Sequence, residues 1–394
     1  MNPPSETGCP SVFSGLASRP SAGRASRWVS APLLAAFLAT AGGAAPPAVV
    51  DLDARTDLQV VVDRESGQYL GHVSTVAWND GKTIFAAYPK GHGKGPIVLR
   101  RSDDGGVTWS QRLPVPENWA TSGETPTLYR VRDPATGAPR ILLFSGLKPA
   151  RIARSDDEGA TWTPLEPIGD WGGIVLMGDL LQRRDGSIAA FFHDDGRFFG
   201  PAPVREAGFT LYSVESRDGG LTWAEPKAIW NGTDVHLCEP GLVASPDGTR
   251  HAMLLRENRR AKQSHVTFSD DEGRTWSPPR EVDPALTGDR HVARYLPDGR
   301  LVISFRDTAA DSPTRGDWVA WIGSWHDLEK GGPGQFRVRL KDNRNAWDCA
   351  YPGVTVLPDG TVVAVTYGHW TEGQPPWILG VRFTAAEVER AAHR

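Results

Sequence analysis

Two short segments place a carboxylate and a phenol at corresponding points of the chain. Residues 237–248 read Leu-Cys-Glu-Pro-Gly-Leu-Val-Ala-Ser-Pro-Asp-Gly, and residues 349–360 read Cys-Ala-Tyr-Pro-Gly-Val-Thr-Val-Leu-Pro-Asp-Gly. Glu239 and Tyr351 each precede Pro-Gly, an apolar run and an Asp-Gly turn, so we expect equivalent positions in two repeats. Arg256 ends the returning run Met-Leu-Leu-Arg. A carboxylate and a phenol can exchange a proton, and a guanidinium can bind an anion bidentately.

Three further segments carry side chains suited to proton transfer or anion binding. The Gly-rich loop 88–97 is cationic, and a histidine there suits proton transfer near neutrality. The run Phe-Phe-His-Asp-Asp-Gly-Arg-Phe ends an expected strand, and Thr-Gly-Asp-Arg-His begins another. A solvated basic loop and a plain Asp-Asp-Gly turn are the structural alternatives. The candidate residues are Lys90, His92, Lys94, His193, Asp194, Asp195, Arg197, Arg290 and His291.

An eight-residue pattern recurs at the spacing expected of structural repeats. Ser-x-Asp-x-Gly-x-Thr-Trp begins at Ser102, Ser155, Ser216 and Ser269. The pattern resembles the Asp-box, in which Ser and Asp side chains hold a tight turn, Gly supplies the positive φ and Trp packs beneath. The acidic residues of these boxes are therefore predicted to be structural.

A second period predicts the fold class. Turn glycines between apolar, β-branched runs indicate six hairpins, most of them followed by a box, which make six four-stranded units. The turn residues are Gly81, Gly137, Gly186, Gly248, Gly299 and Gly360. The sequence therefore predicts an all-β chain, a six-bladed β-propeller of four-stranded antiparallel blades over residues 46–394. Residues 324–331 are predicted to form a degenerate box, and residues 58–64 to complete the last blade.

With these repeats and the order Glu239, Arg256, Tyr351, the chain resembles the sialidase (neuraminidase) superfamily. The resemblance implies an exo-acting, retaining glycoside hydrolase that removes a terminal acidic sugar, such as sialic acid. It also implies Tyr351 as nucleophile, Glu239 as the base that takes its proton, and arginines that bind the substrate carboxylate. Arg256 matches the second arginine of the family, and Arg306 and Arg315 compete for the third.

The chain departs from the family pattern in its first blade. Residues 69–75 lack the first arginine, and His72 lies closest to its place. The loop 88–97 lacks the acidic residue of the family, so His92 is predicted as the general acid and Lys90 as a replacement for the missing positive charge. Asp194 or Asp195 is the alternative acid. Two other functions stay open: a lyase acting on uronates, with His92 or His72 and Tyr351 as the acid–base pair, and a propeller that binds glycans without catalysis.

Composition limits the partners. The net charge of −4 gives no reason to expect nucleic acid, and no motif specifies a cofactor or metal. Residues 1–45 resemble a signal peptide, with a basic region, a short apolar run and small residues. We therefore expect a secreted or periplasmic monomer without a stable membrane span, acting on an acidic glycan. Cys238 and Cys349 are expected either to form one disulfide or to remain two buried thiols.

Overall fold

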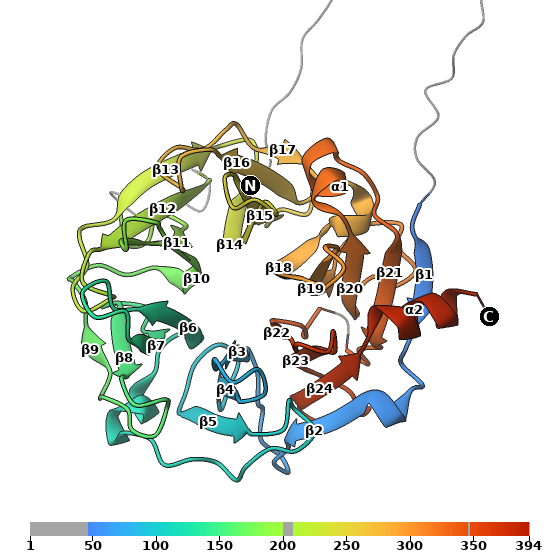
Figure 1. Cartoon of the computed structure of the whole chain (residues 1–394), viewed down its shortest axis with the longest axis horizontal. Helices are drawn as coiled ribbons and strands as arrows, with labels where there is room; N and C mark the ends of the chain where they lie inside the picture. Colours follow the sequence, from blue (N-terminus) through green and yellow to red (C-terminus); the bar gives the residue numbers. More distant parts are fainter. Residues whose placement is uncertain (1–45, 200–207, 346, 394) are drawn as a thin grey trace, which may run out of the picture. The chain divides into compact units, whose positions relative to one another are not determined.

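The computed structural model describes residues 46–199, 208–345 and 347–393, which form a ring of six β-sheets (Figure 1). This arrangement confirms the six-bladed β-propeller. The leader predicted for residues 1–45 lies outside the described residues. Within the described ranges, no helix is long and apolar enough to cross a membrane.

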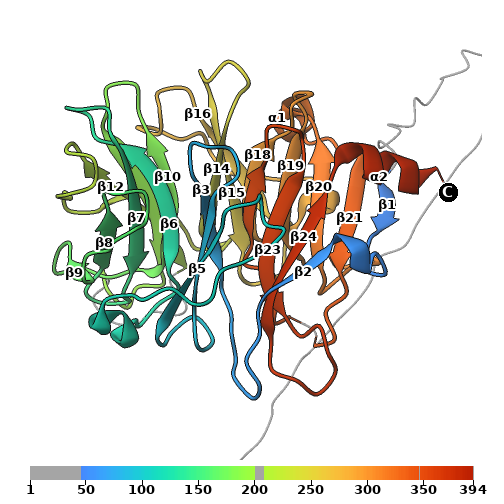
Figure 2. The ribbon, with the colours of Figure 1, turned by 60° about the horizontal axis from the view of Figure 1, so that its bottom comes forward.

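In each blade consecutive strands pair antiparallel, and Figure 2 shows the ring in an oblique view. The first two blades contain β3 (Ser74–Ala77), β4 (Ile84–Pro89) and β5 (Ile97–Ser102), then β6 (Thr127–Arg132), β7 (Pro139–Ser145), β8 (Arg151–Ser155) and β9 (Glu166–Pro167). The third and fourth contain β10 (Ile174–Gln182), β11 (Ile188–Asp194), β12 (Phe209–Ser216) and β13 (Lys227–Gly232), then β14 (Leu237–Ala244), β15 (His251–Glu257), β16 (His265–Ser269) and β17 (Arg280–Glu281). The fifth contains β18 (Gly288–Tyr295), β19 (Leu301–Asp307), β20 (Trp318–Gly323) and β21 (Phe336–Lys341), and the sixth β22 (Gly353–Val356), β23 (Val362–Gly368) and β24 (Trp377–Phe383).

Two N-terminal strands complete the sheets at the ring's outside. The strand β2 (Gln59–Asp63) pairs antiparallel with β24, which confirms the predicted closure of the last blade. The strand β1 (Ala48–Asp51) adds in parallel to β21, and the C-terminal helix α2 (Ala385–Ala392) lies beside it (Figure 1). Among the described residues, the first blade therefore has three strands, the fifth has five and the others have four.

The predicted turns are present with the expected backbone geometry. The six hairpin glycines all have φ between 70° and 86°, a region that favours glycine. In each repeated turn the serine hydroxyl accepts from a glycine N–H, and the aspartate accepts from the threonine N–H. In the second turn, for example, Asp157 accepts from the Thr161 N–H at 2.9 Å and from the Ser155 hydroxyl at 2.8 Å.

The prediction of a degenerate box at residues 324–331 is wrong. This segment is the short helix α1 (Trp325–Lys330), which Ser324 caps and which Gly331 ends in the left-handed conformation. The physical reason is spacing: Ser324 and Asp327 stand three residues apart and exchange side-chain-to-backbone bonds, which makes a capping box instead of a turn.

The core lies between the blades. Six hydrophobic clusters each join two consecutive blades, and the cluster containing Val73, Ile84, Val363 and Tyr367 joins the sixth blade to the first. Because every blade packs on both neighbours, the heads of the innermost strands are fixed around one axis.

Candidate active site

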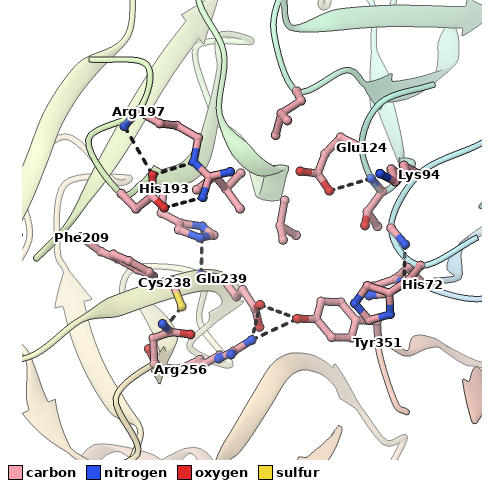
Figure 3. A pocket seen from close by; sticks show the side chains of 18 of the residues that line it. His72, Lys94, Glu124, His193, Arg197, Phe209, Cys238, Glu239, Arg256 and Tyr351 are labelled. Carbon is pink, nitrogen blue, oxygen red and sulfur yellow. Dashed lines mark hydrogen bonds and ion pairs between the residues drawn. The ribbon is translucent and has the colours of Figure 1, made fainter. Parts of the chain in front are cut away.

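A cavity of about 600 Å³ lies where the heads of the innermost strands meet (Figure 3). Its wall includes His72, Thr125, Val175, Glu239 and Tyr351, from the first, second, third, fourth and sixth blades. The loop 88–97 contributes His92 and Lys94. This volume suits a small-molecule ligand.

The strand registers show why these residues converge. Pairing of the innermost strand begins at Ser74 in the first blade and at Gly353 in the sixth, and it resumes after a register shift at Gly241 in the fourth and at Val292 in the fifth. Two positions before these residues stand His72, Tyr351, Glu239 and Arg290, in the same order. The predicted equivalence of Glu239 and Tyr351 is thus confirmed by pairing.

The backbone at these heads is unusual for residues with side chains. His72, Glu239 and Arg290 have φ of 54°, 53° and 56°, and Ala350, directly before Tyr351, has 56°. Glu239 and Arg290 lie in bulges, where the register shifts. Such conformations cost about 1–3 kcal/mol each and are concentrated at functional sites, because they direct a side chain away from the regular pleat.

Glu239, Tyr351 and Arg256 form one hydrogen-bonded group on the cavity wall (Figure 3). The Tyr351 hydroxyl donates to Glu239 Oε1 at 2.5 Å, and Arg256 Nη1 donates to the same oxygen at 2.7 Å. Arg256 Nη1 also lies 3.1 Å from the Tyr351 hydroxyl. Burial raises the pKa of Tyr351 well above its ordinary value, and the Glu239 charge adds to this. The resting group is therefore a neutral phenol that donates to a carboxylate.

Behind this group, one buried carboxylate holds three guanidinium groups. Asp289 is 0% exposed and forms ion pairs with Arg256, Arg260 and Arg306. Although burial opposes ionisation, the three arginines hold the pKa of Asp289 well below its ordinary value. Two carboxylates, Asp289 and Glu239, thus face three guanidinium groups, which leaves one positive charge in excess beside the cavity.

His72 lies in the cavity wall with both ring nitrogens engaged. Its Nδ1 accepts from the Gly93 N–H at 3.1 Å, and its Nε2 lies 3.3 Å from the Tyr367 hydroxyl. The ring lies 4.5 Å from that of Tyr351, between centroids. Burial lowers the pKa of His72 well below its ordinary value. A neutral ring with both nitrogens occupied is suited to holding Tyr351 in place, not to moving protons.

The side chains of the cationic loop 88–97 lie partly on the cavity wall and partly outside it. His92 and Lys94 line the cavity, whereas Lys90 lies outside its wall and pairs with Glu65 at 2.9 Å. The His92 side chain is 68% exposed, and its Nδ1 lies 3.3 Å from Asp348. The structure thus brings His92 to the cavity but not Lys90.

The remaining predicted residues lie at different depths. Arg197 lines the cavity, paired with Asp195, and this pairing lowers the pKa of Asp195. Asp194 accepts three backbone N–H groups in the turn after β11. Arg306 is buried behind the wall, with its guanidinium 5.9 Å from the Tyr351 ring.

Arg290 and Arg315 lie away from the main wall. Arg290 is buried and lines a small adjoining cavity that also contacts Tyr351. Arg315 is exposed, with its guanidinium 5.0 Å from the Trp347 ring. Of the two candidates for a third arginine, Arg306 is therefore the one near Tyr351.

Sequence reasoning missed two carboxylates of this region. Asp289 directly precedes Arg290, and its role as a common partner of three arginines depends on contacts between blades four and five. Glu124 lines the cavity from the head of the second blade. Its segment, Gly-Glu-Thr-Pro before the strand Thr127–Arg132, is a Glu-x-Pro variant of Glu239-Pro-Gly, and this signal was available.

Cys238 and Cys349 are two buried free thiols, so the structure supports the second of the two predicted alternatives. Within the described ranges, no group of three or more His, Cys, Asp and Glu side chains is placed to hold a metal ion.

The chain belongs to a known family of propellers. Residues 144–364 match the family described as BNR repeat-like domain, and this match covers more than half of the chain. The protein is therefore a member of the sialidase and BNR-repeat propeller superfamily.

Individual relatives agree with this assignment. The sialidase of Micromonospora viridifaciens is 27% identical over 392 residues, which cover 86% of this chain and 57% of that protein. The chain thus spans little more than half the length of this curated relative.

Similar solved structures include a protein of unknown function from Dyadobacter fermentans, with 18% identity and a TM-score of 0.66 over 82% of this chain and 97% of that one. The NanB sialidase of Streptococcus pneumoniae has 11% identity and a TM-score of 0.60, over 84% and 71%. An α-L-arabinanase of Penicillium chrysogenum, complexed with arabinobiose, has 15% identity and a TM-score of 0.58, over 82% and 97%. At these identities the likeness shows the fold alone.

Proposed function

We propose that the protein is an exo-acting glycoside hydrolase that removes a terminal acidic sugar with retention of configuration. The observation that carries this proposal is the bond from the Tyr351 hydroxyl to Glu239, at 2.5 Å, on the wall of the axial cavity. A hydroxyl nucleophile with an adjacent base is the usual arrangement for covalent catalysis.

In the proposed reaction, Tyr351 attacks the anomeric carbon while its proton passes to Glu239. The bond from the anomeric carbon to the leaving oxygen breaks, and a glycosyl–tyrosine intermediate forms. Water then replaces the phenol, which recovers its proton from Glu239. A neutral phenol suits a substrate with a carboxylate on the reacting carbon, because an aspartate or glutamate nucleophile would be repelled.

The electrostatics support an acidic sugar. Arg256, Arg260 and Arg306 outnumber Asp289 and Glu239, and on the wall the cations Lys94 and Arg197 balance the carboxyl groups of Glu124 and Asp195. Planar guanidinium groups bind carboxylates bidentately. The relative from Micromonospora viridifaciens, named a sialidase, points to the same class of substrate. The leader pattern supports action outside the cytoplasm.

One observation keeps a lyase as the second candidate: His92, an exposed histidine, lies in the same cavity as Tyr351. His72 is a weak candidate for the acid or base of a lyase, since both of its ring nitrogens are engaged. A lyase forms an unsaturated product that absorbs in the ultraviolet and consumes no water.

The test is a screen of methylumbelliferyl glycosides of sialic, ulosonic and uronic acids. We expect turnover of at least one glycoside, and Tyr351→Phe should lower kcat by more than about 10³-fold without unfolding the protein. Full activity of Tyr351→Phe, or an unsaturated sugar as the product, would exclude the proposed mechanism. Binding without any turnover would favour a non-catalytic propeller.

A further inference from the structure

The proposed reaction needs a group that protonates the leaving oxygen, and the acids predicted from the sequence are poorly placed for this. Asp194 does not line the cavity, and its Oδ2 accepts from three backbone N–H groups in a turn. The Arg197 guanidinium lowers the pKa of Asp195 and therefore keeps it ionised. His92 is largely exposed and is tied through Nδ1 to Asp348 and the Tyr69 hydroxyl.

Glu124 lies on the same cavity, across from the Tyr351–Glu239 pair (Figure 3). It follows the short 3-10 helix Glu117–Thr121 and precedes β6, at the head of the second blade. Only 8% of the residue is exposed. Its own carbonyl oxygen accepts from the hydroxyls of Ser122, at 2.8 Å, and Ser145, at 3.2 Å, so its backbone is fixed in place.

The carboxyl group of Glu124 is buried without a cationic partner. One oxygen, Oε1, accepts from the Thr125 N–H at 2.8 Å. In the part of the chain that the structure describes, Glu124 makes no ion pair, unlike Glu239 and Asp195, which each contact an arginine. No cation therefore holds the Glu124 carboxyl group in its ionised form, and the group lies on the wall where a ligand in the cavity can contact it.

The surroundings favour the protonated form of Glu124. Burial raises its pKa most, hydrogen bonds from the Thr125 and Val175 backbones and the Thr125 side chain work in the opposite direction, and the charge of Glu239 adds a smaller increase, so that the pKa lies above its ordinary value. In glycosidases, two nearby carboxyl groups commonly have different pKa values because their surroundings differ. One then acts as the acid and the other as the nucleophile or base.

We propose that Glu124 is the general acid of the reaction. This inference rests on the proposed hydrolase function. As the phenol oxygen of Tyr351 bonds to the anomeric carbon and the bond to the leaving oxygen breaks, the Glu124 proton passes to that leaving oxygen. In the second half, Glu124 takes a proton from the attacking water as the bond to Tyr351 breaks.

The test compares two substrates with the same terminal sugar. The first is a methylumbelliferyl glycoside that the wild type hydrolyses, whose leaving group needs little protonation. The second is the corresponding oligosaccharide, whose sugar leaving group must be protonated. For Glu124→Gln we expect kcat/KM to fall less than about 10-fold on the aryl glycoside but by about 10²–10⁴-fold on the oligosaccharide.

Two additional readouts separate catalysis from a structural role. The basic limb of the wild-type pH profile should disappear in Glu124→Gln. Added azide should restore turnover of the aryl glycoside by Glu124→Gln, with a glycosyl azide as product, because an anion needs no base to attack the intermediate. The matched control is Glu166→Gln, an exposed glutamate outside the cavity wall, which should behave as wild type on both substrates.

Equal losses on both substrates for Glu124→Gln, or a leaving-group dependence in His92→Gln, would overturn the assignment of the acid. The parallel Tyr351→Phe measurement separates this failure from failure of the proposed function. If Tyr351→Phe is inactive on both substrates, the hydrolase mechanism stands without Glu124. If Tyr351→Phe stays active, or the wild type hydrolyses neither substrate, both proposals fall together.

Discussion

In the first four blades, the repeated turns contrast with the heads of the innermost strands. The turns starting at Ser102, Ser155, Ser216 and Ser269 repeat nearly the same hydrogen bonds, because each aspartate satisfies backbone N–H groups of its own segment. The heads share a register but present different side chains, such as His72, Glu239, Arg290 and Tyr351. Acidic residues therefore have different uses in the two regions: in the turns they hold the backbone, and at the heads they contact residues from other blades.

The largest effect is expected from a change at a head. Glu239→Gln keeps the size of the side chain but removes the base for Tyr351, so kcat should fall by about 10²–10⁴-fold while most of the stability remains. Kinetics on the best glycoside of the screen, with circular dichroism of the folded protein, test this. An exposed glutamate, Glu166→Gln, is the control and should leave kcat unchanged. A Glu239→Gln enzyme with wild-type kcat would contradict the role of the head residues.

Asp289 lies at the head of an innermost strand, and its ion pairs also stabilise the fold. Asp289→Asn leaves three guanidinium groups without their shared counter-charge, so the free energy of unfolding near pH 7 should fall by about 3–5 kcal/mol. Urea unfolding of the variant against the exposed control Asp311→Asn measures this.

The same residue predicts a pH dependence. The arginines depress the pKa of Asp289 in the folded state below the ordinary value of 3.8. Its contribution to stability is therefore fully present above pH 3.8 and is lost as the pH falls through the lower folded pKa. Wild-type stability should decline below about pH 4 more steeply than that of Asp289→Asn. If the stability of the two proteins declined equally as the pH falls, Asp289 would not be ionised in the folded state.

The smallest effect is expected from a repeated turn. Asp157→Ala removes bonds to the Thr161 N–H and the Ser155 hydroxyl, and should lower the free energy of unfolding by about 1–3 kcal/mol. Asp104→Ala, in the equivalent turn, should cost the same, and neither change should alter KM or kcat of the folded protein. A loss of activity without a loss of stability would show that these turns contribute to the active site, as the strand heads do.

Much of the fold was predictable because its signals are local. The six hairpin glycines, the four repeated turns and the closing strand are each encoded in a few consecutive residues, and the structure contains all of them. The failure at residues 324–331 has a local cause too, since a serine and an aspartate three residues apart cap a helix. The equivalence of Glu239 and Tyr351 was visible in the shared Pro-Gly and Asp-Gly spacing.

The sequence by itself thus determined the blades, the turns and which strand heads face the axis. Only the tertiary structure decided the partners at those heads: Tyr351 meets Glu239 across 112 residues of chain, three arginines share Asp289, and Glu124 lies in the same cavity. The physical reason is that turn geometry depends on neighbouring residues, whereas burial and charge pairing depend on every blade that surrounds the axis.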